Sequence, residues 1–294
     1  MARFQSRELL LVNAFTHPDG TGGNAAAIVL EADDLSDGDK LAVAAAAGLS
    51  ETAFVSDSAV ASIKLEFFTP RRRIAHCGHA TIATFGFFGS TGRLSAGAHT
   101  KETMDGLREV TVAGAYASME QTPPKFLAVD QERVLAALGL APADLDPRFP
   151  PERVDTGNGF IVVGVKDTDL LESLDVDAKT IEQVSELYDI VGFYVFTTAT
   201  ADPEVAATSR MFAPRYGIDE EAATGMAAGP LACLLYREGA APEQMTIEQG
   251  RFMTPPSPSR IDASLTVRDG AIIKLGVGGL ANVTGSTKVR FKST

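Results

Sequence analysis

The sequence feature that most constrains the fold is a motif that occurs twice, about half a chain apart. In the first copy a strand-like run ends in Phe68-Thr69-Pro70, and a loop leads to Gly78-His79-Ala80 and an apolar helical run. In the second copy a run ends in Phe212-Ala213-Pro214, and a loop leads to Gly225-Met226-Ala227 and another apolar run. Positions 68 and 212 are 144 residues apart in a chain of 294. A strand–loop–helix unit repeated in this way predicts two lobes of one architecture.

Both predicted helices begin at a glycine after a loop. The first turn of a helix has N–H groups without intrahelical partners and carries the positive end of the helix dipole. If both first turns face a cleft shared by the lobes, that cleft is a binding site for an anion.

Short strand-like runs alternate with alanine-rich helical runs in the rest of the chain. The helical run 37–47 stops at Gly48, as a helix C-terminus should. We predict an N-terminal lobe over 1–120, a proline-rich crossing region over 121–151 and a C-terminal lobe over 152–294, with the last strand a candidate to return to the N-terminal lobe. Strands are predicted at 9–15, 25–30, 52–55, 63–68, 160–165, 192–196 and 271–277, and helices at 37–47, 80–88 and 130–138.

Charge and composition exclude several classes of protein. The net charge is -12 and the pI is about 4.8, so nucleic acid is not expected as a partner. Two cysteines in a chain of this length do not make a disulfide framework. The N-terminus lacks the apolar stretch of a signal peptide, and no apolar segment is long enough to span a membrane. The sequence therefore predicts a soluble cytoplasmic protein.

Glu51 is the first candidate for chemistry. It lies in Leu49-Ser50-Glu51-Thr52-Ala53-Phe54, between a helix that ends in glycine and a strand. Its mostly apolar neighbours favour a partly buried carboxylate with a raised pKa, as a general acid or base at neutral pH requires. The alternative is an ordinary helix cap or surface carboxylate.

His79 has three possible functions and one structural alternative. His76, Cys77 and His79 could ligate zinc, but no second cluster of ligands exists in the sequence, so no metal is predicted. Cys77 and His79 could form a nucleophilic pair, although positions i and i+2 rarely point at each other. His79 could also exchange a proton with substrate at the cleft. The alternative is a hydrogen-bonded structural histidine.

Two further segments could contact a ligand. The loop Asp19-Gly20-Thr21-Gly22-Gly23-Asn24 lacks the spacing of a nucleotide-binding loop, so it indicates either a close approach to a small ligand or an ordinary turn. The acidic residues in Glu220-Glu221-Ala222-Ala223-Thr224-Gly225 are either helix caps or a polar wall that faces substrate, with Thr224 and the Gly225 N–H as carboxylate binders.

Taken together, these segments resemble the PhzF-like family, relatives of diaminopimelate epimerase and proline racemase. They occur in the family's order over nearly the whole chain. The matching segments are Gly22-Gly23-Asn24, Leu49-Ser50-Glu51-Thr52-Ala53-Phe54-Val55, Phe68-Thr69-Pro70 with Cys77-Gly78-His79-Ala80-Thr81, Arg210-Met211-Phe212-Ala213-Pro214 with Ala223-Thr224-Gly225, and Glu248-Gln249-Gly250.

The resemblance implies an α/β (α+β) fold of two similar lobes, each a curved, mostly antiparallel sheet wrapped around a central helix, with the active site in the cleft between them. It also implies a homodimer and a reaction without a cofactor. Glu51 matches the family's catalytic acid/base, and His79 matches the cleft histidine. The substrate-binding groups it implies are Gly23, Asn24, Gly78, Thr224 and Gly225.

This chain departs from the family pattern at four places. The cleft aspartate is replaced by Glu221, and the hydroxyl that follows the Thr-Gly pair is replaced by the thioether of Met226. Arg73 stands at an acidic position, and Thr254-Pro255-Pro256-Ser257 lacks the family's arginine. These changes leave the base in place and predict an altered pocket.

The resulting prediction is an isomerase that moves a proton on a small carboxylate substrate, with Glu51 as acid/base and His79 and Glu221 as hydrogen-bonding groups. One alternative is a two-base racemase or epimerase of amino or hydroxy acids, in which Cys77 is one of the bases. The other is a small-molecule binding protein that kept the fold and lost turnover.

Overall fold

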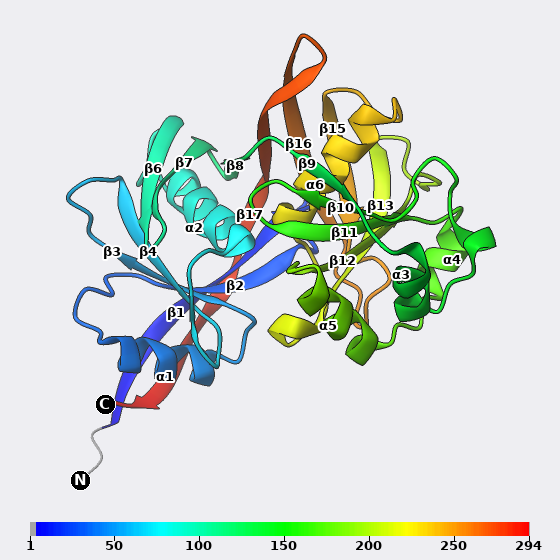
Figure 1. Ribbon diagram of the computed structural model, residues 1–294. Helices are drawn as coiled ribbons and strands as arrows, with labels where there is room; N and C mark the ends of the chain where they lie inside the picture. The colour runs from blue at the N-terminus through cyan, green and yellow to red at the C-terminus, as the bar shows by residue number, and fades with distance from the viewer. Residues whose placement is uncertain (1–3, 294) are drawn as a thin grey trace. The chain divides into compact units, whose positions relative to one another are not determined.

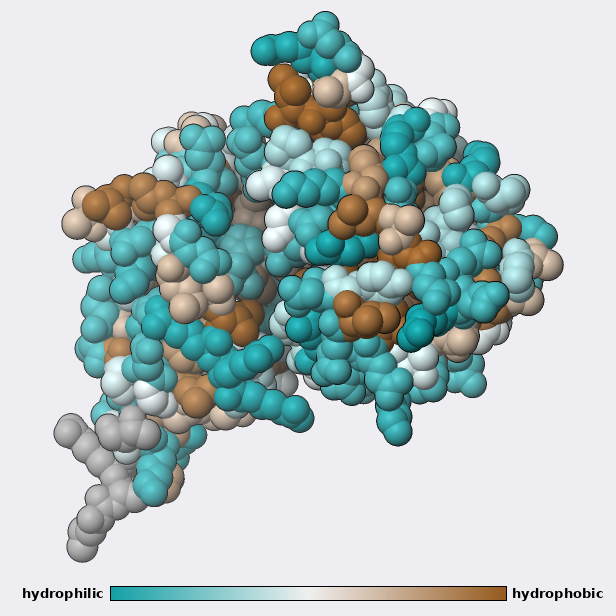
Figure 2. Space-filling view, in the orientation of Figure 1, coloured by the Kyte–Doolittle hydropathy of each residue, from teal (hydrophilic) through white to brown (hydrophobic). Residues whose placement is uncertain are grey.

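The computed structural model describes residues 4–293, and the fold is mixed α/β with strands predominating (Figure 1). The chain divides into two compact units, residues 1–120 with 278–294 and residues 121–277. Among residues 4–293, no helix is both long and apolar enough to cross a membrane. On the face in Figure 2, hydrophilic residues cover most of the surface and hydrophobic ones form small separate patches.

The strands of the first unit form a closed, barrel-like sheet. β17 pairs with β1, and the pairing continues through β2, β3, β4, β6, β7 and β8 back to β17. Most pairs are antiparallel, but β2–β3 and β4–β6 are parallel. The strands are β1 (Phe4–Thr16), β2 (Asn24–Val29), β3 (Thr52–Ser56), β4 (Ile63–Phe68), β5 (Arg73–Ile74), β6 (Gly97–Thr103), β7 (Gly106–Ala113), β8 (Tyr116–Gln121) and the C-terminal part of β17 (Ala271–Lys292).

Helix α2 (Gly78–Ser90) is buried on every side from Gly78 to Phe88 and contacts β1, β2, β3 and β7. Its sequence is apolar all round because no face meets water. The turn between β7 and β8 approaches so closely that a Cβ on Gly86 would lie 2.6 Å from the Ala115 carbonyl oxygen. On the outer side of the same strands, α1 (Asp37–Ala47) packs on a core that includes Leu9, Phe54 and Phe68.

In the second unit, helices cover both faces of the sheet. β11 and β12 are parallel and buried along their whole length, as is typical of strands covered on two sides. Helix α6 (Gly225–Arg237) contacts β10, β11, β15 and β16, while α3 (Gln131–Leu138), α4 (Thr168–Glu172) and α5 (Ala178–Leu187) contribute to a core shared with β11, β12 and β13. The strands are β9 (Lys125–Ala128), β10 (Glu152–Asp155), β11 (Gly159–Gly164), β12 (Gly192–Thr197), β13 (Val205–Ala213), β14 (Ile218–Glu221), β15 (Gln244–Gln249) and β16 (Ser259–Arg268).

Residues 121–151 form β9, α3 and a 3-10 turn at Pro142–Asp144, and side chains such as Leu135, Leu138 and Leu145 lie in the core of the second unit. The strands and helices predicted from the sequence are all present. Most boundaries shift by a few residues, but the strand predicted at 271–277 continues to Lys292 in β17, and the one predicted at 9–15 begins at Phe4 in β1. The predicted end of α1 is confirmed, because Gly48 is left-handed with φ 69° and its N–H caps the helix.

The repeated motif is also confirmed as local structure. β4 leads through a loop to α2, and β13 leads through a loop that contains β14 to α6. Both helices are 13 residues long and begin at a glycine, and neither N-cap side chain makes a capping hydrogen bond.

Candidate functional site

Glu51 is a buried carboxylate at the amino end of β3. Its side chain is 8% exposed, and within residues 4–293 its Oε2 atom accepts no hydrogen bond. The Nε2 atom of His79 lies 3.3 Å from this oxygen, a contact without hydrogen-bond geometry. The alternative of a surface or capping glutamate is therefore wrong. A buried carboxylate oxygen that accepts no other hydrogen bond can accept a proton or a hydrogen bond from a substrate.

Cys77 and His79 do point at each other, and our expectation for positions i and i+2 is wrong here. Cys77 Sγ lies 3.7 Å from His79 Nδ1. The expectation assumes that both residues are helical, whereas Cys77 is the extended N-cap residue of α2, with φ −141° and ψ 120°. Burial raises the pKa of the Cys77 thiol, so the sulfur carries its proton at neutral pH. Nδ1 of His79 therefore faces the thiol, and Nε2 faces Glu51.

Glu51, Cys77 and His79 are the one group among the described residues that could hold a metal ion, with donor atoms within 4.8 Å of one another. Thiolate, imidazole and carboxylate are all zinc ligands, so the donor types fit. The ligand set considered from the sequence differs, because the His76 ring instead lies 3.4 Å from the amine of Lys101. Burial and the nearby cations lower the pKa of His76 to about 3.

The predicted anion binders Gly23 and Asn24 lie in and after a tight turn. Gly23 has φ 81°, and a Cβ there would lie 2.5 Å from the Ala14 carbonyl oxygen, so only glycine fits. Asn24 begins β2, which runs parallel to β3, so Asn24 and Glu51 both lie toward the amino ends of neighbouring strands. The backbone of Ala27 donates to the Glu51 carbonyl oxygen at 3.3 Å.

In the second unit, Glu221 and Thr224 lie together just before α6. Both are buried, and the Thr224 hydroxyl donates to the Glu221 carboxylate. Gln249 on β15 holds both residues, since its amide nitrogen donates to the Glu221 backbone oxygen (2.6 Å) and to Thr224 Oγ1 (3.1 Å), and its oxygen accepts from the Thr224 N–H (3.0 Å). The Tyr194 hydroxyl donates to the side-chain oxygen of Gln249 at 3.0 Å and accepts from the Ser209 hydroxyl at 2.8 Å. Sequence reasoning assigned no role to these three supporting residues.

Gly225 and Met226 form the first turn of α6. Gln121 donates to the Gly225 carbonyl oxygen at 2.9 Å, and the Asn158 amide donates to the sulfur of Met226 at 3.3 Å. Where the family pattern has a hydroxyl, this chain therefore has a thioether with an amide beside it. The sequence did not indicate Asn158, because it lies in a different segment, just before β11.

One departure from the family pattern, Arg73, has a structural explanation. Arg73 pairs with Glu66 at 2.7 Å and with Asp37 at 3.0 Å, so it ties β5 to β4 and α1. Arg251 lies close in sequence to the segment 254–257 that lacks the family's arginine, and its guanidinium pairs with the Glu248 carboxylate at 2.6 Å.

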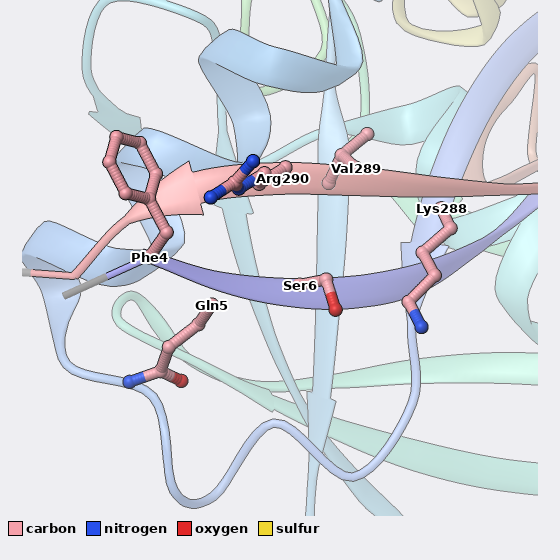
Figure 3. Close-up of a pocket in the computed structure, with 6 residues that line it drawn as sticks. All are labelled: Phe4, Gln5, Ser6, Lys288, Val289 and Arg290. Carbon is pink, nitrogen blue, oxygen red and sulfur yellow. The ribbon is translucent and has the colours of Figure 1, made fainter.

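A separate depression of about 420 Å³ lies at the outer end of the β1–β17 ribbon, lined by Phe4, Gln5, Ser6, Lys288, Val289 and Arg290 (Figure 3). The guanidinium of Arg290 stacks over the Phe4 ring at 4.6 Å. The residues that line this depression include no carboxylate, thiol or imidazole, so the depression does not provide the acid/base groups present at Glu51.

Comparison with known proteins gives a consistent family. The model of the phenazine biosynthesis-like proteins (PhzC-PhzF) matches residues 12–285. An uncharacterized isomerase of Deinococcus radiodurans is 32% identical, with 92% of this chain and 91% of that protein covered. The trans-2,3-dihydro-3-hydroxyanthranilate isomerase of Pseudomonas fluorescens is also 32% identical, with 74% and 76% covered. The crystal structure of a Bacillus anthracis PhzF-family protein superposes with a TM-score of 0.88 at 26% identity, with 97% and 99% covered. This chain is therefore an isomerase that belongs to the phenazine biosynthesis-like (PhzC-PhzF) family.

Proposed function

We propose that the protein moves a proton on a small carboxylate substrate, by a double-bond shift or an epimerisation, and that Glu51 is the acid/base. The observation that supports this most is the buried Glu51 Oε2, which accepts no hydrogen bond within residues 4–293 and lies 3.3 Å from His79. A base that must take a proton from carbon needs such an oxygen, shielded from water and not already used.

His79 and Glu221 then hydrogen-bond polar groups of the substrate, and Gly23, Asn24, Thr224 and the first-turn N–H groups of Gly78 and Gly225 hold its carboxylate. Donors fixed in advance by the fold stabilise developing negative charge without reorganising. The proposal includes two similar lobes that bind one substrate in the cleft between them. This part of the proposal rests on the resemblance to the family. Homodimer formation and a cytoplasmic location are likewise predictions.

The test is deuterium incorporation from heavy water into a panel of small cyclic and linear carboxylic acids that includes trans-2,3-dihydro-3-hydroxyanthranilate. Glu51→Gln keeps the shape and removes the basicity, so exchange should fall by about 10³-fold or more while binding stays within about tenfold. Glu248→Gln, at an equally buried glutamate paired with Arg251, is the matched control and should keep exchange. A Glu51→Gln protein with near-normal exchange would refute the proposed role.

The thiol beside His79 favours a second candidate, a two-base epimerase in which Cys77 is one base. The raised pKa of Cys77 weakens this reading, as does the absence of a second suitable thiol. The chain has only one other cysteine, Cys233, and it is buried within α6 with its pKa raised to about 12 by burial. Cys77→Ser should therefore keep exchange within about tenfold, and exchange should persist in a chelator. A collapsed rate in a folded Cys77→Ser protein would favour the thiol mechanism.

A further inference from the structure

Lys101 is a buried cation that the proposed chemistry does not use. It lies on β6 with no exposed surface, and its ammonium donates to Thr81 Oγ1 at 2.7 Å. It also lies 3.4 Å from His76 Nδ1 and 3.6 Å from the sulfur of Met119. Within residues 4–293, no carboxylate forms an ion pair with it. Burial of an ammonium with only neutral partners is expensive, so this arrangement needs an explanation.

The surroundings of Lys101 do little to offset that cost. The ring of Phe67 lies 5.3 Å from the ammonium, and Lys101 contacts α2 in its first turn, where the positive end of the helix dipole opposes a cation. Burial lowers the pKa of Lys101 to about 7. The charged and titratable groups that face it are His76 and Cys77 before α2, Asp105 in the turn after β6 and Arg108 on β7.

The hydrogen bonds of Lys101 lead directly to the proposed site. Thr81 accepts from the ammonium and donates its own proton to the carbonyl oxygen of Cys77 at 2.7 Å. Cys77 is the N-cap residue of α2, and its sulfur contacts His79, which faces Glu51. Because Thr81 has one proton to donate, a donor at Lys101 forces that proton toward Cys77 and fixes the first turn of the helix.

We propose that Lys101 is a positioning residue, which acts through Thr81 and the Cys77 carbonyl to hold the first turn of α2, and with it His79, in register with Glu51. This inference rests on the proposed function. The amine does not touch substrate. It sets the geometry of the groups that do, and it does so most strongly while protonated, because charge-assisted hydrogen bonds are the stronger ones.

The test uses the full chain with Lys101→Met, which keeps the length of the side chain and removes the amine. We expect the kcat for deuterium exchange to fall about tenfold or more, with KM within about threefold. We also expect the wild-type rate to decline as the pH rises through about 7, where Lys101 loses its proton, and this decline to be missing in the variant. A loss of fold alone does not predict a selective effect on kcat or a changed pH profile.

Two further variants keep the inference falsifiable. Thr81→Val removes the same hydrogen bond without touching the amine, and its effect should not add to that of Lys101→Met, since both break one chain of contacts. Lys64→Met, at a half-buried lysine on the neighbouring β4, is the control and should behave as wild type. A folded Lys101→Met protein with wild-type kcat and pH profile would overturn the inference. If instead Glu51→Gln keeps exchange, the proposed role of Glu51 fails, whatever Lys101→Met does.

Discussion

The N-terminal turns of α2 and α6 are similar in backbone and opposite in chemistry. Each helix has 13 residues, begins at a glycine and lacks a side-chain cap. The turn of α2 is surrounded by ionisable groups, namely Glu51, Cys77, His79 and, behind them, Lys101. The turn of α6 is held by the neutral amide of Gln249 and by hydroxyl groups, with Glu221 as the nearby carboxylate. In the proposed function, the α2 turn supplies the mobile proton and the α6 turn supplies fixed contacts to the substrate.

The largest expected effect comes from removing one carboxylate in each unit and comparing the results. Glu51→Gln should lower kcat by about 10³-fold or more, because it removes the base. Glu221→Gln should instead raise KM by about tenfold and lower kcat by less than tenfold, because it removes a substrate contact. Steady-state exchange kinetics of both variants provide the measurement. If Glu221→Gln costs as much kcat as Glu51→Gln, the division of labour between the two turns is wrong.

Gln249→Leu tests how much the hydrogen bonds of the neutral Gln249 amide stabilise the α6 turn. Leucine fills a similar volume but leaves the Tyr194 hydroxyl, the Thr224 N–H and the Glu221 carbonyl oxygen without their partner. Unsatisfied buried polar groups cost about 1–3 kcal/mol each, so the free energy of unfolding should fall by about 3 kcal/mol or more. Urea denaturation measures this, with Gln244→Leu at the exposed start of the same strand as control. Equal midpoints for the two variants would show that the network carries little energy.

In contrast to Gln249→Leu, Lys101→Met should raise the free energy of unfolding. The unfolded lysine has a pKa near 10.5 and the folded one about 7, so below pH 7 both states hold the proton and the folded state bears the full cost of burying it. Between the two values only the unfolded state holds it, so the wild type gains stability as the pH rises, by up to about 1.4 kcal/mol per pH unit.

The variant lacks this group, so it should be more stable than wild type at pH 6, and its advantage should shrink by about 3 kcal/mol by pH 9. Urea denaturation at the two pH values is the measurement, and Lys64→Met should show no such trend. Parallel stability curves for wild type and Lys101→Met would mean that the buried amine does not titrate in this range. If the variant is more stable and less active, the buried lysine destabilises the fold and positions the groups of the site.

The repeated motif, the glycine starts of both helices and the burial of Glu51 could be predicted from local signals in the sequence, whereas the roles of Glu51 and His79 were implied by the resemblance to the family. The glycines mark helix starts, and the apolar neighbours of Glu51 indicate its burial. The residues behind the site have no such signal. Lys101 lies in Thr100-Lys101-Glu102, which is as polar as any exposed strand, and only the closure of the sheet around α2 buries it. Gln249 was visible as part of a motif, but its role depends on contacts with residues 25 and 28 positions away.

The thiol–imidazole contact shows a different limit. Spacing rules for helices apply to two helical residues, and Cys77 is extended. A residue at an N-cap can therefore meet a side chain that the helical spacing would keep apart. Asn158 was missed for a third reason, since its contact with Met226 joins the segment before β11 to α6, 68 positions along the chain.

The smallest expected effect concerns substrate choice at the α6 turn, where Glu221 and Met226 depart from the family pattern. Glu221 is one methylene longer than aspartate, and Met226 cannot donate a hydrogen bond. The neighbouring Asn158 amide can donate, and at present it donates to the Met226 sulfur. The pocket should therefore discriminate weakly for a substrate hydroxyl, whereas a site built to bind one rejects the analogue without it by about 10⁴-fold or more.

Glu221→Asp combined with Met226→Ser should restore a hydroxyl at this wall and widen the acceptance of hydroxylated cyclic acids by a few-fold. Proton exchange for wild type and the double variant over a panel of such acids is the measurement, and Asn158→Ala in both backgrounds separates the amide from the new hydroxyl. In the wild type, loss of the amide should remove the weak preference for hydroxylated acids, because the amide is a hydrogen-bond donor beside Met226. In the double variant the same loss should matter less, because the serine also donates. If the wild type already turns over trans-2,3-dihydro-3-hydroxyanthranilate well and the double variant gains nothing, the two departures do not set specificity, and the fixed contacts of the second unit then recognise the carboxylate alone.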